Sequence, residues 1–187
     1  MEYKKLSYQI VGVSPLLMHN GRLADPTYSF TKEMKKISSK RKKVDSDYEQ
    51  MAKLDFFGGL YLEDKMPIIP AEVMEATLVE SAKRNRLGKV TMGALYCPHN
   101  FFLSYEGEQD VEKRFDKEDC KLVCGVVIGQ SRVMRTRPLF KEWSANIEIC
   151  YDPERLNETE ILEIIRNSGN VGLMDWRPKF GRFKVEI

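Results

Sequence analysis

Two segments with strong helix signals alternate along this chain with segments that have the periodicity of strands. Residues 71–84 follow Pro70, and proline is favourable at the first position of a helix. Residues 157–169 begin with Asn157 and Glu160, which have the spacing of a capping box. Helices that alternate with strands bury their apolar sides against a sheet, so the chain is expected to fold as a layered α+β protein.

The strand-like segments complete a recognisable order. They occupy residues 3–13, 90–96, 100–105, 121–129, 143–151 and 182–187, and Gly88 and Gly169 are expected to end the two helices. Without insertions, the order is strand, helix, strand, strand, helix, strand. This order predicts a ferredoxin-like (RRM-like) antiparallel sheet with helices on one face. We expect a single domain over residues 1–187, with a basic insertion around 20–60 and a second insertion around 100–140.

Composition narrows the class of protein. The chain has 187 residues, enough for one sizeable core, with 42% hydrophobic and 31% charged residues. Its start lacks the apolar core of a signal peptide and no run is long enough to span a membrane, so we expect a cytoplasmic protein without a membrane partner. Its four cysteines are scattered, which favours reduced thiols over disulfides and gives poor zinc spacing. No metal and no cofactor are expected.

Charge is segregated along the chain, although the net charge is only +2. The basic run in residues 31–43 comprises Lys32, Lys35, Lys36, Lys40, Arg41, Lys42 and Lys43. Such a run is either a solvated or disordered excursion or a mobile arm that contacts a phosphate backbone. A short helix is expected over residues 46–57. The arginines Arg132, Arg135 and Arg137 lie either at the tip of a hairpin or in a nucleic-acid-binding surface.

The C-terminal residues 170–187 combine glycines, cations and aromatics. Gly172 and Gly181 permit tight backbone turns or close approach to a ligand. The charged and aromatic members are Arg177, Lys179, Arg182, Trp176, Phe180 and Phe183. Positive charge beside flat rings is typical of surfaces that bind single-stranded nucleic acid. The alternative is a plain edge strand whose aromatics pack in the core, and Trp176 stays open between the two.

Three segments also resemble one family, in the same order along the chain. Residues 10–18 resemble the opening strand and turn of the RAMP superfamily, the backbone proteins of CRISPR effector complexes. Residues 67–77 resemble the segment that leads into the first helix of that family, and residues 172–183 resemble its C-terminal glycine-rich loop. The resemblance covers the ferredoxin-like core, about half of the chain.

The resemblance implies that single-stranded RNA lies across the glycine-rich loop, with copies of this chain or related subunits side by side. It also implies that the basic insertion lies between neighbours. Ala71, Glu75 and Met174 depart from the family pattern. Three alternatives stay open. The chain could be a stand-alone or virus-encoded relative, it could bind DNA, or it could join or inhibit a defence complex through protein contacts.

Catalysis has two candidate residues. His19 follows the first strand, and some processing members of the family use a histidine as general acid or base, without a metal, to cleave RNA. Lys35 or Lys36 could steady the negative charge. Asp25 lies where some backbone subunits place a cleaving aspartate that works with a divalent metal. A histidine at a strand end and an Asp-Pro turn are common structural features, so binding is favoured over enzymatic activity.

Overall fold

The computed structural model describes residues 2–186 and divides into two compact units. The first unit is formed within residues 1–16, 62–106 and 141–187. The second unit is formed within residues 17–61 and 107–140. The second unit thus contains most of the two regions in which insertions are expected, while residues 100–106 belong to the first unit. A single domain with insertions stays a prediction.

The first unit contains an antiparallel sheet in the order β11-β1-β10-β5. Its strands are β11 (Phe183–Glu186), β1 (Lys4–Gly12), β10 (Trp143–Tyr151) and β5 (Leu95–Tyr96). The central strands β1 and β10 pair over eight positions, from Lys4 with Tyr151 to Val11 with Ser144. This order confirms the ferredoxin-like α+β fold, in which the last strand lies beside the first.

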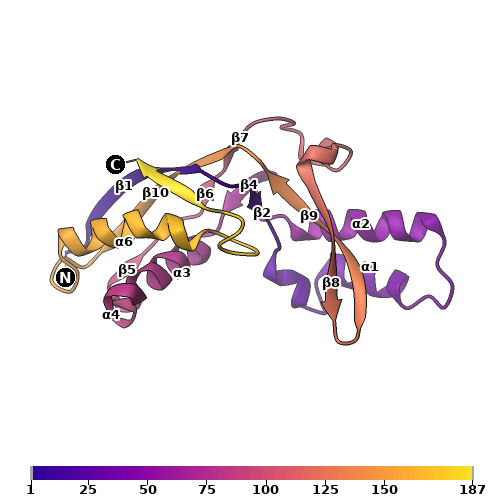
Figure 1. Cartoon of the computed structure of the whole chain (residues 1–187), viewed down its shortest axis with the longest axis horizontal. Helices are drawn as coiled ribbons and strands as arrows, with labels where there is room; N and C mark the ends of the chain where they lie inside the picture. The colour runs from indigo at the N-terminus through magenta and orange to yellow at the C-terminus, as the bar shows by residue number, and fades with distance from the viewer. Residues whose placement is uncertain (1, 187) are drawn as a thin grey trace. The chain divides into compact units, whose positions relative to one another are not determined.

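Two helices, α3 (Ala71–Ala82) and α6 (Glu158–Val171), cover one face of this sheet (Figure 1). The alternation expected for the strands places Ile10 and Ile147 on that face, where both are buried. The helices contribute buried Met74, Leu78 and Ile161. The core of the first unit therefore lies between the sheet and this helix pair.

The capping signals are partly confirmed. Asn157 and Glu160 form the expected capping box of α6. The expectation that Gly169 ends this helix is wrong, because α6 continues to Val171 and Gly172 is its C-cap. Pro70 is the N-cap of α3 instead of its first residue, and the Ala71 N–H donates to the Asn100 side chain at 3.0 Å.

The segment after α3 differs from expectation. A 3-10 turn follows at Lys83–Asn85, and Arg86 adopts the left-handed conformation that reverses the chain. Gly88 begins a second helix, α4 (Gly88–Ala94), so the strand expected over residues 90–96 is wrong except for its last two residues. Buried Thr91 and Ala94 fix this segment as a helix through tertiary packing, which overrides its strand-like pattern.

The remaining short strands of the first unit pair at its periphery. They are β3 (Leu62–Glu63), β4 (Met66–Ile69), β6 (Phe101–Phe102) and β7 (Ser104–Tyr105). The strands β3, β4 and β6 form a second small sheet, and β7 pairs with β10.

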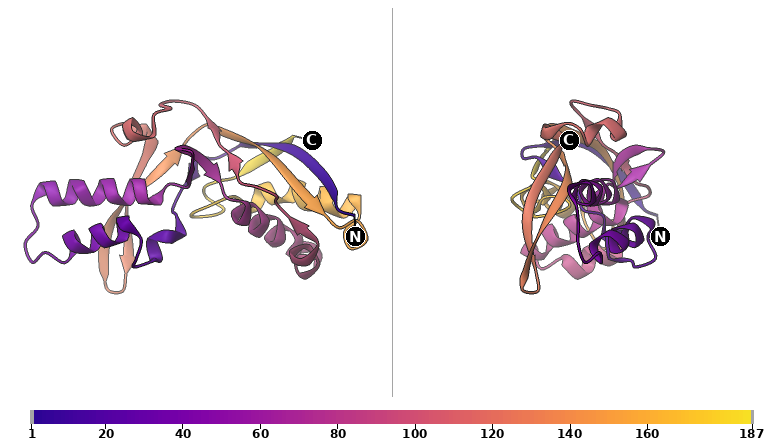
Figure 2. Two further views of the ribbon diagram at one scale, coloured as in Figure 1. Left: turned by 180° about the vertical axis from the view of Figure 1, so that it is seen from behind. Right: turned by 90° about the vertical axis from the view of Figure 1, so that its right-hand side faces the viewer.

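The second unit combines a helical hairpin with a β-hairpin (Figure 2). Its elements are a 3-10 turn (Gly21–Ala24), α1 (Ser29–Ser38), α2 (Asp45–Gly59), α5 (Val111–Arg114), a 3-10 turn (Glu118–Cys120), β8 (Lys121–Ile128) and β9 (Ser131–Phe140). A two-residue strand, β2 (Leu16–Leu17), precedes them. The short helix α5 and the second 3-10 turn lie in the segment that leads into β8.

The basic run of residues 31–43 is largely exposed, as a solvated segment would be, and its first part is helical, so the expectation of a disordered excursion is wrong for that part. A mobile arm that contacts a phosphate backbone stays a prediction. The first part of the run is α1, which buries Ile37 and packs against α2. After it, Lys40 Nζ lies 2.6 Å from Asp47 Oδ1, and Asp47 Oδ2 accepts from the Val44 N–H at 3.1 Å.

No helix within residues 2–186 is both long and apolar enough to cross a membrane. The cysteines at 97, 120, 124 and 150 are all free thiols.

Candidate nucleic-acid interface

The glycine-rich loop, residues 172–182, closes on itself directly after α6. The Gly172 N–H donates to Ser168 O at 3.2 Å and ends the helix. The Leu173 N–H donates to Gly181 O at 2.9 Å, which joins the two ends of the loop. Within it, the Phe180 N–H donates to Trp176 O at 3.2 Å. The loop is therefore a closed, hydrogen-bonded structure of its own.

The two predicted backbone-shaping glycines are required by this closure. Gly172 and Gly181 have φ angles of 80° and 72°, in the left-handed region that favours glycine. A Cβ at Gly181 would lie 2.1 Å from Leu173 O, and one at Gly172 would lie 3.0 Å from Phe180 O. Their close neighbours are thus the backbone of the loop.

The three segments that resemble the RAMP family meet at this loop. The Gly181 N–H donates to Pro15 O at 2.8 Å, and the Arg182 N–H donates to Ser14 Oγ at 2.9 Å. On the other side, Thr77 Oγ1 of α3 lies 3.3 Å from Gly172 O and accepts from Arg177 Nη1 at 3.3 Å. The end of the first strand and the first helix therefore hold the loop between them.

The outer side of the loop presents charge and flat rings. Arg177, Lys179 and Arg182 are exposed. The side chain of Trp176 is 37% exposed, which excludes a place in the core, and its ring centroid lies 6.2 Å from that of Phe180. Three cations beside an exposed indole can hold phosphates and stack on a base.

A hollow in the second unit brings together several of the other predicted residues. It has a volume of about 400 Å³ and is lined by His19, Leu23, Ala24, Thr31, Met34, Lys35, Ser38, Asp55 and Arg135. The catalytic candidate His19 and Lys35, one of the two lysines expected to assist it, thus line the same hollow. Lys36, on the same helix, is not among the lining residues.

A buried carboxylate organises the wall of this hollow. Asp55 is 5% exposed, and its two oxygens accept from Arg135 Nη1 at 3.3 Å and from the Thr136 N–H at 2.8 Å. Burial lowers the pKa of His19 below its usual 6.5, and the positive charge of Arg137 lowers it further, while Asp55 opposes the shift. His19 is therefore mainly neutral at pH 7, as a general base requires.

Asp25 stands apart from this hollow. Its Oδ1 accepts from both the N–H and the hydroxyl of Thr27, each at 2.7 Å, and these bonds lower its pKa. The carboxylate therefore closes its own turn. Within residues 2–186, no group of three or more His, Cys, Asp or Glu side chains is placed to hold a metal ion.

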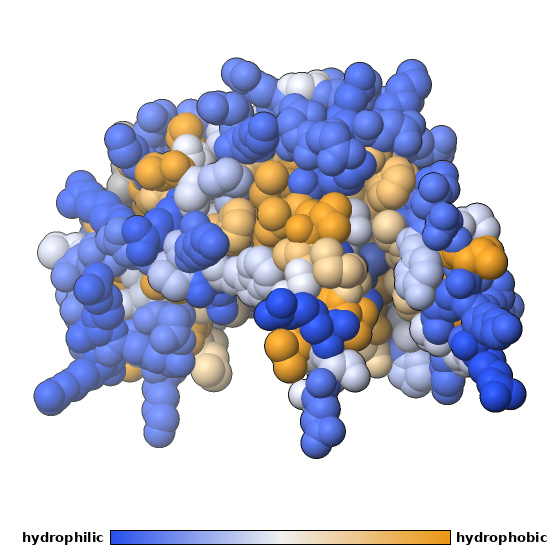
Figure 3. Space-filling model, turned by 45° about the vertical axis from the view of Figure 1, so that its right-hand side comes forward, coloured by the Kyte–Doolittle hydropathy of each residue, from blue (hydrophilic) through white to orange (hydrophobic). Residues whose placement is uncertain are grey.

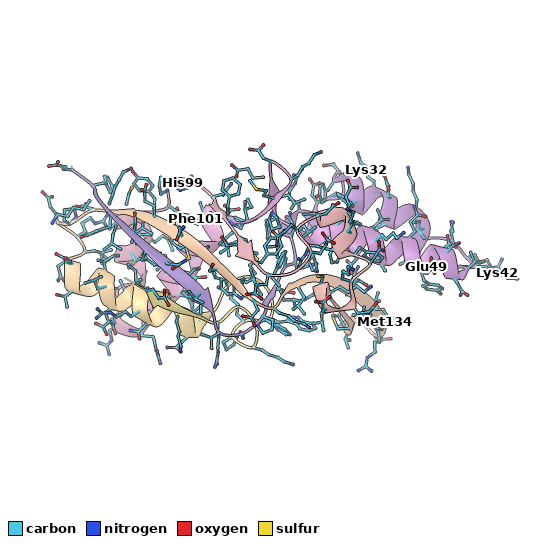
Figure 4. All side chains as sticks on the ribbon, turned by 90° about the horizontal axis from the view of Figure 1, so that it is seen from above. Lys32, Lys42, Glu49, His99, Phe101 and Met134 are labelled. Atoms are coloured by element: carbon cyan, nitrogen blue, oxygen red, sulfur yellow. The ribbon has the colours of Figure 1, made fainter. Side chains whose placement is uncertain are left out.

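The basic residues of the second unit differ in their surroundings. Arg41 and Lys42 are exposed at the turn between α1 and α2, where Figure 4 labels Lys42. Lys43 Nζ donates to Lys40 O at 3.1 Å, so these two contribute to the turn itself.

Arg132 lies beside the turn of the β8–β9 hairpin, where it pairs with Val127, but Arg135 and Arg137 lie further along β9. The expectation that the arginines lie at a hairpin tip is therefore wrong for Arg135 and Arg137. Arg132 is exposed, Arg135 is paired with Asp55, and Arg137 is only 7% exposed.

Sequence reasoning missed several residues that shape these sites. Ser14 and Thr77 lie inside the family-like segments, but nothing in the sequence shows that their hydroxyls hold the loop. Asp55 gave one usable signal, because it is an acidic residue between apolar Leu54 and Phe56 in an expected helix.

Comparisons with known proteins bear on the fold. No protein-family model matches the chain, and no curated protein matches it. Among solved structures, it is similar to a chain in the cryo-EM structure of the Type III-B Cmr-beta bound to cognate target RNA, with a TM-score of 0.54 and 11% sequence identity. The match covers 100% of this chain and 60% of that one, so this chain spans about 60% of that chain's length. At this identity the match shows a shared fold, and it supports a RAMP-like fold for this chain.

Proposed function

We propose that this chain binds single-stranded RNA as a backbone-type subunit of a CRISPR-like ribonucleoprotein. The observation that carries the proposal is the closed loop of residues 172–182, held by Ser14 and Thr77, which presents Arg177, Lys179 and Arg182 beside an exposed indole. The second unit has its own exposed lysines and arginines, on α1, the turn that follows it and the start of β9.

The positions of the basic residues support this role better than the net charge of the chain does. The net charge of +2 is too small to attract a polyanion by itself, so binding depends on local clusters. A loop whose backbone is already fixed by hydrogen bonds also loses little conformational entropy when a ligand orders its side chains. The similarity to a chain of an RNA-bound assembly agrees with this proposal.

The test replaces Arg177, Lys179 and Arg182 together by alanine. Each lost phosphate contact reduces the salt dependence of single-strand binding by roughly 0.7 in the slope of log K against log salt, so the triple variant should lose roughly 2 in slope. We expect at least a tenfold loss of affinity for a labelled RNA at moderate salt. The same titration with a DNA strand shows which nucleic acid is preferred.

A matched control removes the same charge elsewhere in the first unit. Arg84, Lys89 and Arg166 are exposed, and replacing all three by alanine also removes three positive charges. This control should retain most of the affinity and slope. Equal losses in both variants would show that overall charge, and not the loop, drives binding. If wild-type protein binds neither strand at low salt, a protein-interaction subunit becomes the better description.

A second candidate function, metal-independent cleavage of RNA, is favoured by the shared hollow of His19 and Lys35. Neutral His19 would take the proton from a ribose 2′-hydroxyl as its oxygen attacks the adjacent phosphorus. Lys35 would stabilise the negative charge on the phosphorane. The 5′-oxygen would take a proton from water as it leaves, and His19 would return its own proton to the resulting hydroxide. The products would be a 2′,3′-cyclic phosphate and a 5′-hydroxyl.

The cleavage test compares wild type with His19→Ala on a labelled RNA in the presence of a chelator. Wild-type cleavage that disappears in the variant, and on a strand lacking 2′-hydroxyls, supports this function. Equal cleavage by both proteins, or none by either, rejects it.

A further inference from the structure

A second hollow lies in the second unit, on the other side of Asp55 and Arg135. It has a volume of about 480 Å³ and is lined by Met34, Tyr48, Met51, Ala52, Asp55, Arg132, Val133, Met134, Arg135 and Thr136. The helices α1 and α2 supply one side and the strand β9 supplies the other. Met34, Asp55 and Arg135 also line the hollow that contains His19.

Flexible, apolar side chains form much of the wall of this second hollow. Three methionines and Tyr48 line it, and thioether side chains adapt to flat ligands of different outline. Tyr48 is 58% exposed and Met134 is 62% exposed, so both are unusually open for residues of their size. Hydrophobic residues reach the surface of the molecule among hydrophilic ones in Figure 3, and Figure 4 labels Met134 on the β-hairpin.

Positive charge borders the apolar walls. Arg132 is exposed, and Arg135 is oriented by Asp55 through Nη1. A guanidinium carries five N–H donors, so a pair through one nitrogen leaves donors on the same group for an anion. Lys35 lines the adjoining hollow. An apolar ligand that carries negative charge at its edge fits this arrangement.

We infer that this second hollow, which we call the base hollow, accepts an unpaired nucleobase of a bound single strand. This inference rests on the proposed function and names a second contact for the same ligand. The volume lies within the range of 300–1,000 Å³ typical of small-molecule sites, and a base with its sugar is small enough to enter. Tyr48 would stack on the base, the methionines would pack around it, and Arg132 and Arg135 would hold the flanking phosphates.

The charges favour this ligand over an apolar peptide. A peptide segment would leave Arg132 without an anionic partner at the rim, whereas a nucleic-acid strand brings one phosphate for every base. Stacking is also tolerant of base identity, because every base has a flat face. The base hollow should therefore strengthen binding without imposing a sequence.

The test compares an RNA strand with an abasic strand that has the same length and phosphates. In wild-type protein the RNA should bind more tightly than the abasic strand. The double variant Tyr48→Ala/Met134→Ala should lose about fivefold or more of its affinity for RNA, the lower end of what one stacked base contributes. Its affinity for the abasic strand should stay unchanged.

The control variant is Phe102→Ala/Met92→Ala, which also removes an exposed aromatic and an exposed methionine. It should behave as wild type with both strands. A double variant at Tyr48 and Met134 that keeps the wild-type ratio of the two affinities would overturn the base hollow, as would a wild-type ratio of one. Failure of wild-type protein to bind either strand would instead overturn the proposed function. Photocrosslinking of a 4-thiouridine strand should, in addition, label peptides that contain Tyr48 or Met134.

Discussion

Replacing Gly181 by alanine should open the glycine-rich loop and destabilise the first unit. Gly181 has a φ of 72°, and an added Cβ would lie 2.1 Å from Leu173 O and 2.8 Å from Leu173 N. Both atoms belong to the backbone, so no side-chain rotation relieves the contact. The two ends of the loop must separate to restore ordinary van der Waals distances.

The cost has two parts. A residue with a Cβ in the left-handed region costs about 1–2 kcal/mol relative to glycine. Separation also breaks the bonds from Leu173 N–H to Gly181 O and from Gly181 N–H to Pro15 O. Each contributes about 1 kcal/mol, which gives a total of about 3–4 kcal/mol. For a protein of this size, each kcal/mol lowers Tm by about 2–4 °C, so we expect a fall on the order of 10 °C.

Thermal unfolding followed by circular dichroism measures this effect, and Gly129→Ala is the matched control. Gly129 has a φ of 61°, and a Cβ there would meet no heavy atom within 4 Å. The control therefore carries the left-handed cost without the backbone contact, and its Tm should fall by roughly 4 °C. If Tm falls by the same amount in both variants, the close approach of Gly181 to Leu173 does not contribute to stability, and the predicted backbone contact is refuted.

Two further predictions concern the second unit. In a denaturant titration, Asp55→Ala should lower the free energy of unfolding by about 2–4 kcal/mol, because the buried Thr136 N–H and Arg135 lose their acceptor. The control Glu80→Ala, which breaks an exposed pair with Lys83, should lower it by less than about 0.5 kcal/mol. The folded-state pKa of His19 is depressed, so the unfolded chain binds its proton more readily, and stability should fall as pH drops below 6.5. His19→Gln should flatten this slope in Tm measured from pH 7.5 to pH 5; an unchanged slope would assign it to other groups.

The strands and helices that position the loop were predictable because their signals are local. Alternation in residues 3–13 and 143–151 and the Asn157–Glu160 capping box depend on neighbouring residues only, and the structure contains all three elements. The region from Gly88 to Ala94 was not predictable in this way. Its apolar residues fit either period over so short a stretch, and packing selected the helix.

The basic run shows a different limit. Its composition indicates a solvated segment, yet its first part forms the helix α1, which buries Ile37 and contacts α2, and Asp47 caps the following helix. The arginines of β9 show the same limit. The sequence places three cations within six residues, but only the fold exposes Arg132, pairs Arg135 with Asp55 and buries Arg137.

Local patterns in the chain predict the α+β class, the order of the main strands and helices, and the glycines and cations of the C-terminal loop. These follow from periodicity, capping and residue type, which are properties of short stretches of chain. Packing of distant segments brings Ser14 and Thr77 to residues 172–182, and it places His19, Lys35 and Asp55 around one hollow. Contacts between residues far apart along the chain depend on how the elements pack, and no local pattern encodes them.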